Sequence, residues 1–413
     1  MRAMTLMLTR PEMRRASSLY FAIGLMQASY LPFAGIIFRD RGVSFEAIGL
    51  IGAVNSMVSL GAAPIWGHLG DAVLGRAAAF RAALLLAAVG VALFAVGPFA
   101  GIPGAAIAAF AGAGLVPLLD SIGMEQLAKV GGQWGPLRAI TSFSYAAMCV
   151  VSGSIVAIGG AVVIGPMYGA TALAVVAGTI GLHTRPALRH TARPTPSDAE
   201  AEIERTEIAG TNAEIAVVGD WRDRFGTVNL AFQQSPGLFS FLMLSLLINL
   251  GAGIFYAYGS FRIQEVGGNA AAVAFGGTIS ALVEIPFFLA GGAIAARLGL
   301  RTLFVLGLLA MGACSVGYAV IDTPSALAIV RSLVGIGFAC TLLASVLSVR
   351  DLVPAALQAT GQALYQSVSY GLAIAIAALI GGIIYGELGA APLFFLSAAI
   401  MFGAIPIAWR VLR

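Results

Sequence analysis

Long apolar runs recur along the whole chain and are separated by short polar connections. The hydrocarbon core of a bilayer is about 30 Å thick, so a helix of roughly 20 apolar residues can cross it. The pattern predicts an all-α membrane protein with twelve transmembrane helices in two six-helix bundles. The predicted spans are residues 17–38, 45–69, 77–97, 102–127, 136–158, 160–182, 237–260, 269–296, 301–321, 324–349, 355–385 and 389–411.

One long polar segment, residues 183–236, separates the two sets of spans. It is rich in proline, arginine and acidic residues, a composition that cannot bury enough apolar surface to form a core. We expect a cytoplasmic linker here, between an N-terminal bundle at 1–182 and a C-terminal bundle at 237–413. A short amphipathic helix within this linker, at 199–207 or at 221–232, remains an open alternative.

Amino-acid composition limits the possible class of protein further. Hydrophobic residues make up 59% of the chain and charged residues only 10%, whereas an ordinary soluble domain carries about 25% charged residues. The net charge of +4 is scattered over short loops, which does not suit a nucleic-acid-binding face. The sequence has neither a nucleophile–base pair nor a phosphate-binding GxxxxGK[ST] motif, and its histidines and cysteines lack metal-ligand spacing. We therefore expect no enzyme, cofactor or metal site.

The distribution of positive charge along the chain predicts the orientation of the protein in the membrane. Most of the 23 lysines and arginines fall in segments on the same side as the N-terminus, and the opposite side holds Arg39, Arg41 and Arg262. Arg138 and Arg331 remain at membrane depth. Because cytoplasmic loops carry the excess of Lys and Arg, both termini and the linker are predicted to be cytoplasmic, in a multi-pass, monomeric protein of the cell (inner) membrane.

A related turn occurs at equivalent places in the two halves. Residues 67–81 read GHLGDAVLGRAAAFR between the second and third spans, and residues 292–301 read GAIAARLGLR between the eighth and ninth. Both turns combine glycine with arginine after an aliphatic residue. Six helices, a linker and six more helices with a matching turn predict two pseudo-symmetric bundles from a duplicated transporter.

The motif Gly67-x-Leu69-x-Asp71, followed by Gly75 and Arg76, resembles the loop motif of the major facilitator superfamily. Within that superfamily, several stretches look like the branch of lactose-permease-like and phenylpropionate-permease-like symporters. These stretches are PIWG at 64–67, LPF at 31–33, PLLD at 117–120, GPLR at 135–138, EIP at 284–286 and QALY at 362–365. The resemblance implies the major facilitator fold, alternating access, and a gating role for the loop residues Gly67, Asp71, Gly75 and Arg76.

Charged residues within apolar spans are the first candidates for a functional site, because a charge inside a bilayer normally faces a partner or a water-filled cavity. Asp120 in the fourth span and Arg138 at the start of the fifth have the spacing of the charge pair of lactose-permease-like proteins. Such a pair can clamp substrate, act as a proton-sensitive latch, or be structural. Glu125 lies nearer to the depth of Arg138 and is the alternative partner.

Two further charges lie in the C-terminal half. Glu284, near the middle of its span, is a candidate proton carrier, or else a neutral acid bonded to a neighbouring helix. Arg331 needs an anion, which can be Glu284 or a group of the substrate, unless its side chain extends outward to the membrane interface.

Uncharged polar residues within the spans are weaker candidates, because many such groups only join helices through hydrogen bonds. A central cavity nevertheless needs a few of them to converge on the substrate. The substrate-binding candidates are Gln27, Tyr30, Asn55, Asn249, Tyr256, Gln362, Tyr365 and Gln366.

Together these features predict a secondary transporter that carries a small organic solute (an aromatic acid, a sugar or a nucleoside) in symport with protons. Asp120 and Glu284 are its candidate titrating groups, and Arg138 and Arg331 stabilise their ionised forms or hold an anionic substrate. The alternative is a proton-driven efflux antiporter for sugars or drugs. A channel would instead give flux that does not saturate and ignores neutralisation of the two acids.

Overall fold

Helices account for the regular structure of the described residues, which in this computed structural model are 11–96, 98–130, 134–180, 221–354 and 357–412. Eleven helical segments within these ranges are long and apolar enough to cross a membrane. The expected all-α membrane architecture is therefore confirmed. The N-terminal helices are α2 (Pro11–Ala28), α3 (Ala34–Asp40), α4 (Phe45–His68), α5 (Arg76–Val96), α6 (Pro98–Val130), α7 (Trp134–Gly159) and α8 (Ile164–Gly178).

The C-terminal half begins with α10 (Trp221–Gln234), which lies inside the predicted linker at one of the two places left open for a short helix. The other place, residues 199–207, lies outside the described residues, and the bundle boundaries stay predictions. The remaining helices are α11 (Pro236–Glu265), α12 (Ala270–Leu298), α13 (Leu300–Val320), α14 (Pro324–Val330), α15 (Ser332–Leu352), α16 (Gln358–Gln366), α17 (Ala373–Leu388) and α18 (Ala390–Val411).

The first predicted span, 17–38, is not one helix but two. Helix α2 starts earlier, at Pro11, and ends at Ala28, and α3 begins at Ala34 after a turn in which the Phe33 amide bonds to the Tyr30 carbonyl at 3.0 Å. Pro32 lies in this turn, and proline has no amide hydrogen with which to continue a helical ladder. Eleven of the twelve predicted spans therefore match a helical segment long and apolar enough to cross a membrane, and the first is divided between α2 and α3.

Other spans contain milder irregularities. The span predicted at 324–349 is interrupted at Arg331, where the Val334 amide bonds to the Arg331 carbonyl at 3.0 Å. The span predicted at 355–385 contains a π-helical turn, η5 (Ser367–Leu372), between α16 and α17, and another π turn, η1 (Leu69–Val73), follows α4. Such irregular turns often occur at functional positions in helices.

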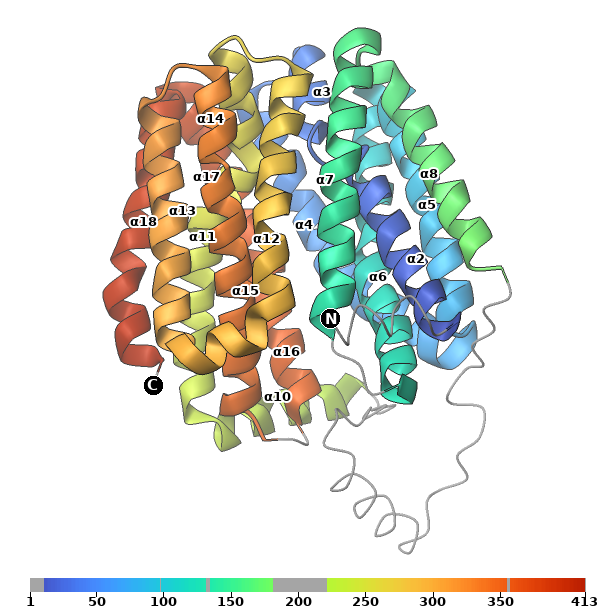
Figure 1. Cartoon of the computed structure of the whole chain (residues 1–413), viewed down its shortest axis with the longest axis vertical. Coiled ribbons are helices and arrows are strands. Elements are labelled where there is room, and N and C mark those ends of the chain that lie inside the picture. Colours follow the sequence, from blue (N-terminus) through green and yellow to red (C-terminus); the bar gives the residue numbers. More distant parts are fainter. Residues whose placement is uncertain (1–10, 97, 131–133, 181–220, 355–356, 413) are drawn as a thin grey trace, which may run out of the picture.

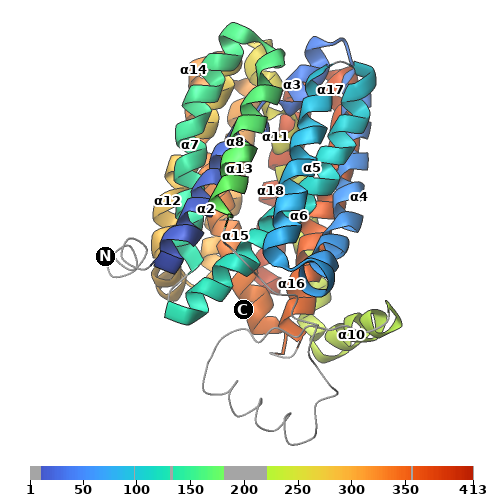
Figure 2. The ribbon, with the colours of Figure 1, turned by 90° about the vertical axis from the view of Figure 1, so that its right-hand side faces the viewer.

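Two groups of helices stand side by side in Figure 1, α2 to α8 and α11 to α18. Within the first group α5 packs on α6 and α8, and α2 on α7; within the second α13 packs on α15 and α18. The groups meet where α7 packs along α12 and where α4 packs along α17. Helices α3 and α14 lie at one end of the molecule, and α10 and α16 at the other (Figures 1 and 2).

Glycine allows the close approach of helices at both inter-group contacts. A Cβ at Gly49 of α4 would clash with the carbonyl oxygen of Ala378 on α17 and lie 2.9 Å from the Tyr258 hydroxyl. A Cβ at Gly153 of α7 would clash with the Ala274 side chain of α12. Small residues commonly permit such contacts between membrane helices, where packing rather than water exclusion drives association.

Candidate functional site

A cavity of about 280 Å³ lies between the two groups of helices. Residues of α2, α7, α11, α12 and α15 line it, together with residues from the breaks between α2 and α3 and between α14 and α15. The lining consists of Gln27, Leu31, Arg138, Thr141, Ser142, Tyr145, Tyr256, Gly277, Ser280, Ala281, Glu284, Arg331, Val334 and Phe338. Its volume lies just below the range of about 300–1,000 Å³ that is usual for small-molecule sites.

The contribution of α7 and α12 to this lining follows from helical periodicity. Arg138, Thr141, Ser142 and Tyr145 recur on α7 at the spacing i, i+3, i+4 and i+7, which places them on one face. Residues 277, 280, 281 and 284 of α12 repeat the same spacing. Because α7 and α12 pack together, each presents one cavity-facing stripe.

Thr141, Ser142, Tyr145 and Ser280 were not among the predicted site residues. A signal for them was present, since polar residues follow the predicted candidate Arg138 at helical spacing inside an otherwise apolar segment.

Glu284 joins the two groups of helices. Its carboxylate Oε2, on α12, accepts a hydrogen bond of 3.1 Å from the Ser142 hydroxyl of α7. It also lies in the same cavity lining as Arg138 and Arg331. Three of the four predicted charged residues are therefore brought together around one cavity, with a direct side-chain bond across the inter-group contact.

Arg331 occupies the junction of α14 and α15. Its Nη1 atom is buried and has no hydrogen-bond partner among the described residues. The guanidinium carbon lies 5.6 Å from the centroid of the Phe255 ring, within reach of a cation–π interaction. Gly276 of α12 leaves room for the side chain, because a Cβ there would lie 2.9 Å from the Arg331 Cδ.

Asp120 lies on α6 and accepts a hydrogen bond of 2.5 Å from the Tyr20 hydroxyl of α2. It does not belong to the described cavity lining, whereas Arg138 does. The predicted Asp120–Arg138 pair stays a prediction. What the geometry adds is a polar link between α2 and α6 within the N-terminal group.

The polar candidates separate into two sets. Gln27 and Tyr256 line the cavity. Tyr30 packs on Phe94, with ring centroids 5.4 Å apart, and the Asn249 amide bonds to the Ser245 carbonyl of its own helix at 2.9 Å.

The remaining polar candidates also lie away from the described lining. The Gln362 amide bonds to the Val346 carbonyl at 3.0 Å, and Tyr365 is buried in the core of the C-terminal group. Asn55 is partly buried on α4 and Gln366 is exposed on α16.

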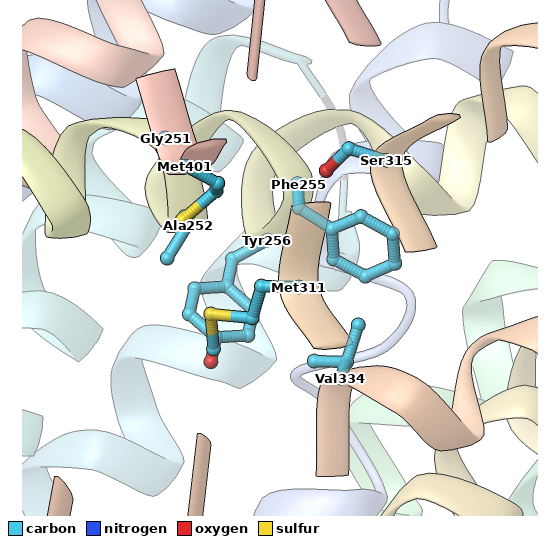
Figure 3. Close-up of a pocket in the computed structure, with 8 residues that line it drawn as sticks. All are labelled: Gly251, Ala252, Phe255, Tyr256, Met311, Ser315, Val334 and Met401. Carbon is cyan, nitrogen blue, oxygen red and sulfur yellow. The ribbon is translucent and has the colours of Figure 1, made fainter. Parts of the chain in front are cut away.

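A second, much smaller pocket of about 10 Å³ adjoins the cavity, with Tyr256 and Val334 lining both. Figure 3 shows Phe255 and Tyr256 of α11 facing Met311 of α13 and the side chain of Val334 around it. A space of this size holds about one water molecule. It is therefore too small for a solute, and the larger cavity is the candidate binding site.

The predicted gating turn lies between α4 and α5. Gly75 has a φ of +81°, a left-handed conformation that favours glycine. The Asp71 carboxylate accepts a bond of 3.0 Å from Arg76 Nε, and Arg76 Nη1 lies 4.0 Å from Glu125 of α6. These ion pairs connect the π turn η1, which follows α4, with α5 and α6. Gly67, near the end of α4, has no atom near its missing Cβ.

Comparison with known proteins identifies the family. A family model described as the MFS_1 like family matches residues 13–396. The chain belongs to the MFS_1-like family. It is thus a secondary transporter of the major facilitator type and not an enzyme, and the resemblance inferred from the loop motif is confirmed.

Relatives of this MFS_1-like transporter are distant. It is 25% identical to a maltose permease of Geobacillus stearothermophilus over 386 residues, which cover 91% of this chain and 89% of that protein. The structure of the nucleoside transporter NupG matches with a TM-score of 0.74 at 15% identity, covering 97% and 99% of the two chains. An auto-inhibited POT family peptide transporter matches with a TM-score of 0.69 at 12% identity, covering 96% of each chain. These structural likenesses show the fold.

Proposed function

We propose that this MFS_1-like transporter moves a small organic solute in symport with protons, by alternating access of the central cavity to the two sides of the membrane. The observation that carries the proposal is the position of Glu284. It is a carboxyl group in the cavity lining, bonded across the contact between the two groups of helices. A protonation change there alters the contact on which rocking of the two groups depends.

The coupling follows from the cost of a buried charge. An ionised carboxylate is expensive to enclose in a low-dielectric cavity, and neutralising it lowers that cost. Protonated Glu284 still offers a donor and an acceptor to Ser142 and the solute. The closed cavity therefore forms more readily with the proton bound, which links solute movement to proton movement. Asp120, bonded to Tyr20 away from the lining, is the second candidate titrating group and acts within the N-terminal group.

The wider proposal keeps the predicted orientation and assembly. Both termini and the linker lie in the cytoplasm, the protein is a monomer in the inner membrane, and the solute is an aromatic acid, a sugar or a nucleoside. The similar proteins are named for maltose, nucleosides and peptides, which supports a small organic solute. The turn with Asp71 and Arg76 helps to hold one end of the N-terminal group closed.

Reconstitution of the purified protein in liposomes tests this proposal. Uptake of radiolabelled maltose, uridine and 3-phenylpropionate is measured with and without an imposed, inside-alkaline pH gradient. For any transported probe we expect accumulation above equilibrium that a protonophore abolishes. Glu284→Gln should remove the accumulation yet keep the exchange of labelled for unlabelled solute, because exchange requires no net proton movement. Glu387→Gln, the same substitution at an exposed site on α17, is the matched control.

Accumulation by Glu284→Gln equal to that of the unsubstituted protein would contradict the role given to this residue. The alternative, a proton-driven efflux antiporter, uses the same cavity and the same acid. It predicts that an outward movement of solute accompanies inward proton flow. Liposomes preloaded with the probe distinguish the two, since an inward proton gradient accelerates loss of the probe only in the antiporter.

A further inference from the structure

Charged side chains line the cavity from both groups of helices. They are the guanidinium groups of Arg138 and Arg331 and the carboxyl group of Glu284. Arg138 also interacts with other residues of the protein.

Arg331 is the cation of this lining that a bound anion can satisfy. A buried guanidinium is normally paired with an anion and fully hydrogen-bonded, because leaving it unpaired forfeits its hydration without replacement. Here Nη1 is buried without a hydrogen-bond partner among the described residues, and the Phe255 ring provides only a cation–π contact. The same side chain reaches the cavity. We propose that the solute is an organic monoanion whose carboxylate binds the Arg331 guanidinium inside the central cavity.

This inference rests on the proposed function and specifies its substrate class. A planar carboxylate suits the site because guanidinium and carboxylate form two parallel, charge-assisted hydrogen bonds. A single negative charge matches the one guanidinium group of Arg331. The rest of the cavity supplies aromatic side chains from Tyr145, Tyr256 and Phe338, which favour a carbon skeleton with a flat or apolar face.

Protonation of Glu284 strengthens the binding of such an anion, because it removes the negative charge from the lining. The other titratable or charged groups that face the cavity are Arg138 and Tyr145 from α7, Tyr256 from α11 and Arg331 from the α14–α15 junction. Among these five groups, Glu284 is the acid whose charge opposes the anion. Proton and anion thus bind cooperatively at two places in one cavity, so each raises the affinity for the other and the doubly loaded cavity is favoured.

The test is a binding comparison on the full chain in detergent, with matched pairs of a carboxylic acid and its neutral amide. The probes are benzoate and benzamide, 3-phenylpropionate and 3-phenylpropanamide, and lactate and lactamide, with maltose and uridine as neutral solutes. Binding is followed by calorimetry at pH 6 and pH 8. We expect at least one acid to bind about tenfold or more tightly than its amide. Its affinity should rise by about 5- to 150-fold towards low pH, the usual size of coupling between two sites.

Substitutions assign the effect to the residues. Arg331→Gln should abolish the preference for acid over amide, and Arg331→Lys should retain part of it because the charge remains. Arg410→Gln, at an exposed arginine of α18, is the matched control and should change nothing. Glu284→Gln should keep the acid preference but remove its pH dependence. Elution as a single monodisperse peak confirms that each variant folds.

The outcomes separate this inference from the proposed function. Tight binding of maltose or uridine that Arg331→Gln leaves unchanged overturns the anion site and leaves proton-coupled transport intact. Failure of every acid to bind at millimolar concentration also overturns the anion site. An acid that binds through Arg331 with no pH dependence supports the anion site, and contradicts the coupling role of Glu284.

Discussion

Replacement of Arg331 by methionine should stabilise the ligand-free protein while it removes binding of organic anions. Methionine keeps an unbranched stem that can lie against Gly276, where the Arg331 Cδ now packs. It removes a guanidinium whose Nη1 atom is buried without a hydrogen-bond partner among the described residues. A residue held in place for the fold would give the opposite result.

The size of the effect follows from the contacts. Enclosing an ion costs several kcal/mol even after relaxation of the surroundings, and exchanging buried ionic groups for apolar ones of similar volume often stabilises proteins by about 1–4 kcal/mol. The cation–π contact with Phe255 at 5.6 Å offsets up to about 2 kcal/mol of that. Methionine against the same ring recovers about 0.3–1.5 kcal/mol. The middle values of these ranges give a net gain of about 2 kcal/mol, and we take about 1–3 kcal/mol as the expectation.

A thermal melt monitored by tryptophan fluorescence measures this gain. Unfolding entropy near 2.1 cal/mol/K per residue over 413 residues converts about 1–3 kcal/mol into a rise of about 1–3 °C in the melting temperature. Arg331→Lys, which keeps the charge, serves as the comparison and should show no such rise. The anion binding described above should be lost in the same methionine variant.

A fall of the melting temperature by several degrees in Arg331→Met would refute this reasoning. It would mean that the guanidinium contributes more through its contacts than its burial costs. The anion would then have no unsatisfied cation to occupy, and a neutral solute would be the better expectation.

Three further outcomes follow from the packing. Gly49→Ala should destabilise the protein by about 1–3 kcal/mol, because the added Cβ meets the backbone of α17. Gly61→Ala on the same helix is the control, since its Cβ would enter open space. Thermal melts compare the two variants, and equal stability would contradict the close contact. Ser142→Ala should weaken proton-driven accumulation in liposomes while leaving solute exchange in place, because it removes the hydroxyl that bonds α7 to Glu284 of α12. Unchanged accumulation would show that this hydrogen bond is dispensable for transport. Tyr20→Phe should cost about 1.5–3 kcal/mol through loss of a hydrogen bond to a charged group, Asp120. Because Asp120 is the second candidate titrating group, the substitution should slow accumulation more than exchange. Equal slowing of both would leave Asp120 with a structural role.

Local pattern determines a large part of this protein. The length of each apolar run is set by the thickness of the bilayer, and the membrane excludes almost every backbone arrangement except a helix. The spans, the polar segment between the halves and the loop motif at Asp71 and Arg76 could therefore be recognised one stretch at a time. The same reasoning identified Glu284 and Arg331, because an ionisable group in an apolar run is costly wherever the run is placed.

The same reasoning could not predict which residues of different helices lie next to one another. Asp120 bonds to Tyr20, 100 residues away on another helix, and Arg138 lines the same cavity as Glu284 of the other group. Glu284 and Ser142 are 142 residues apart and form a hydrogen bond. The position of a residue within its span gives its depth in the membrane, but it carries no information about the rotation of the helix about its own axis.

The tertiary structure therefore decided the membership of the site. Helix rotation is set by packing over the whole length of the contacts, including the close approach of Gly49 to α17 and of Gly153 to α12. Those contacts turn the stripe 138, 141, 142 and 145 towards the stripe 277, 280, 281 and 284. They also leave Tyr365 buried in the core of its own group. Sequence alone specified helices and their charges, because these depend on local chemistry and the bilayer, whereas the cavity depends on how all the helices pack at once.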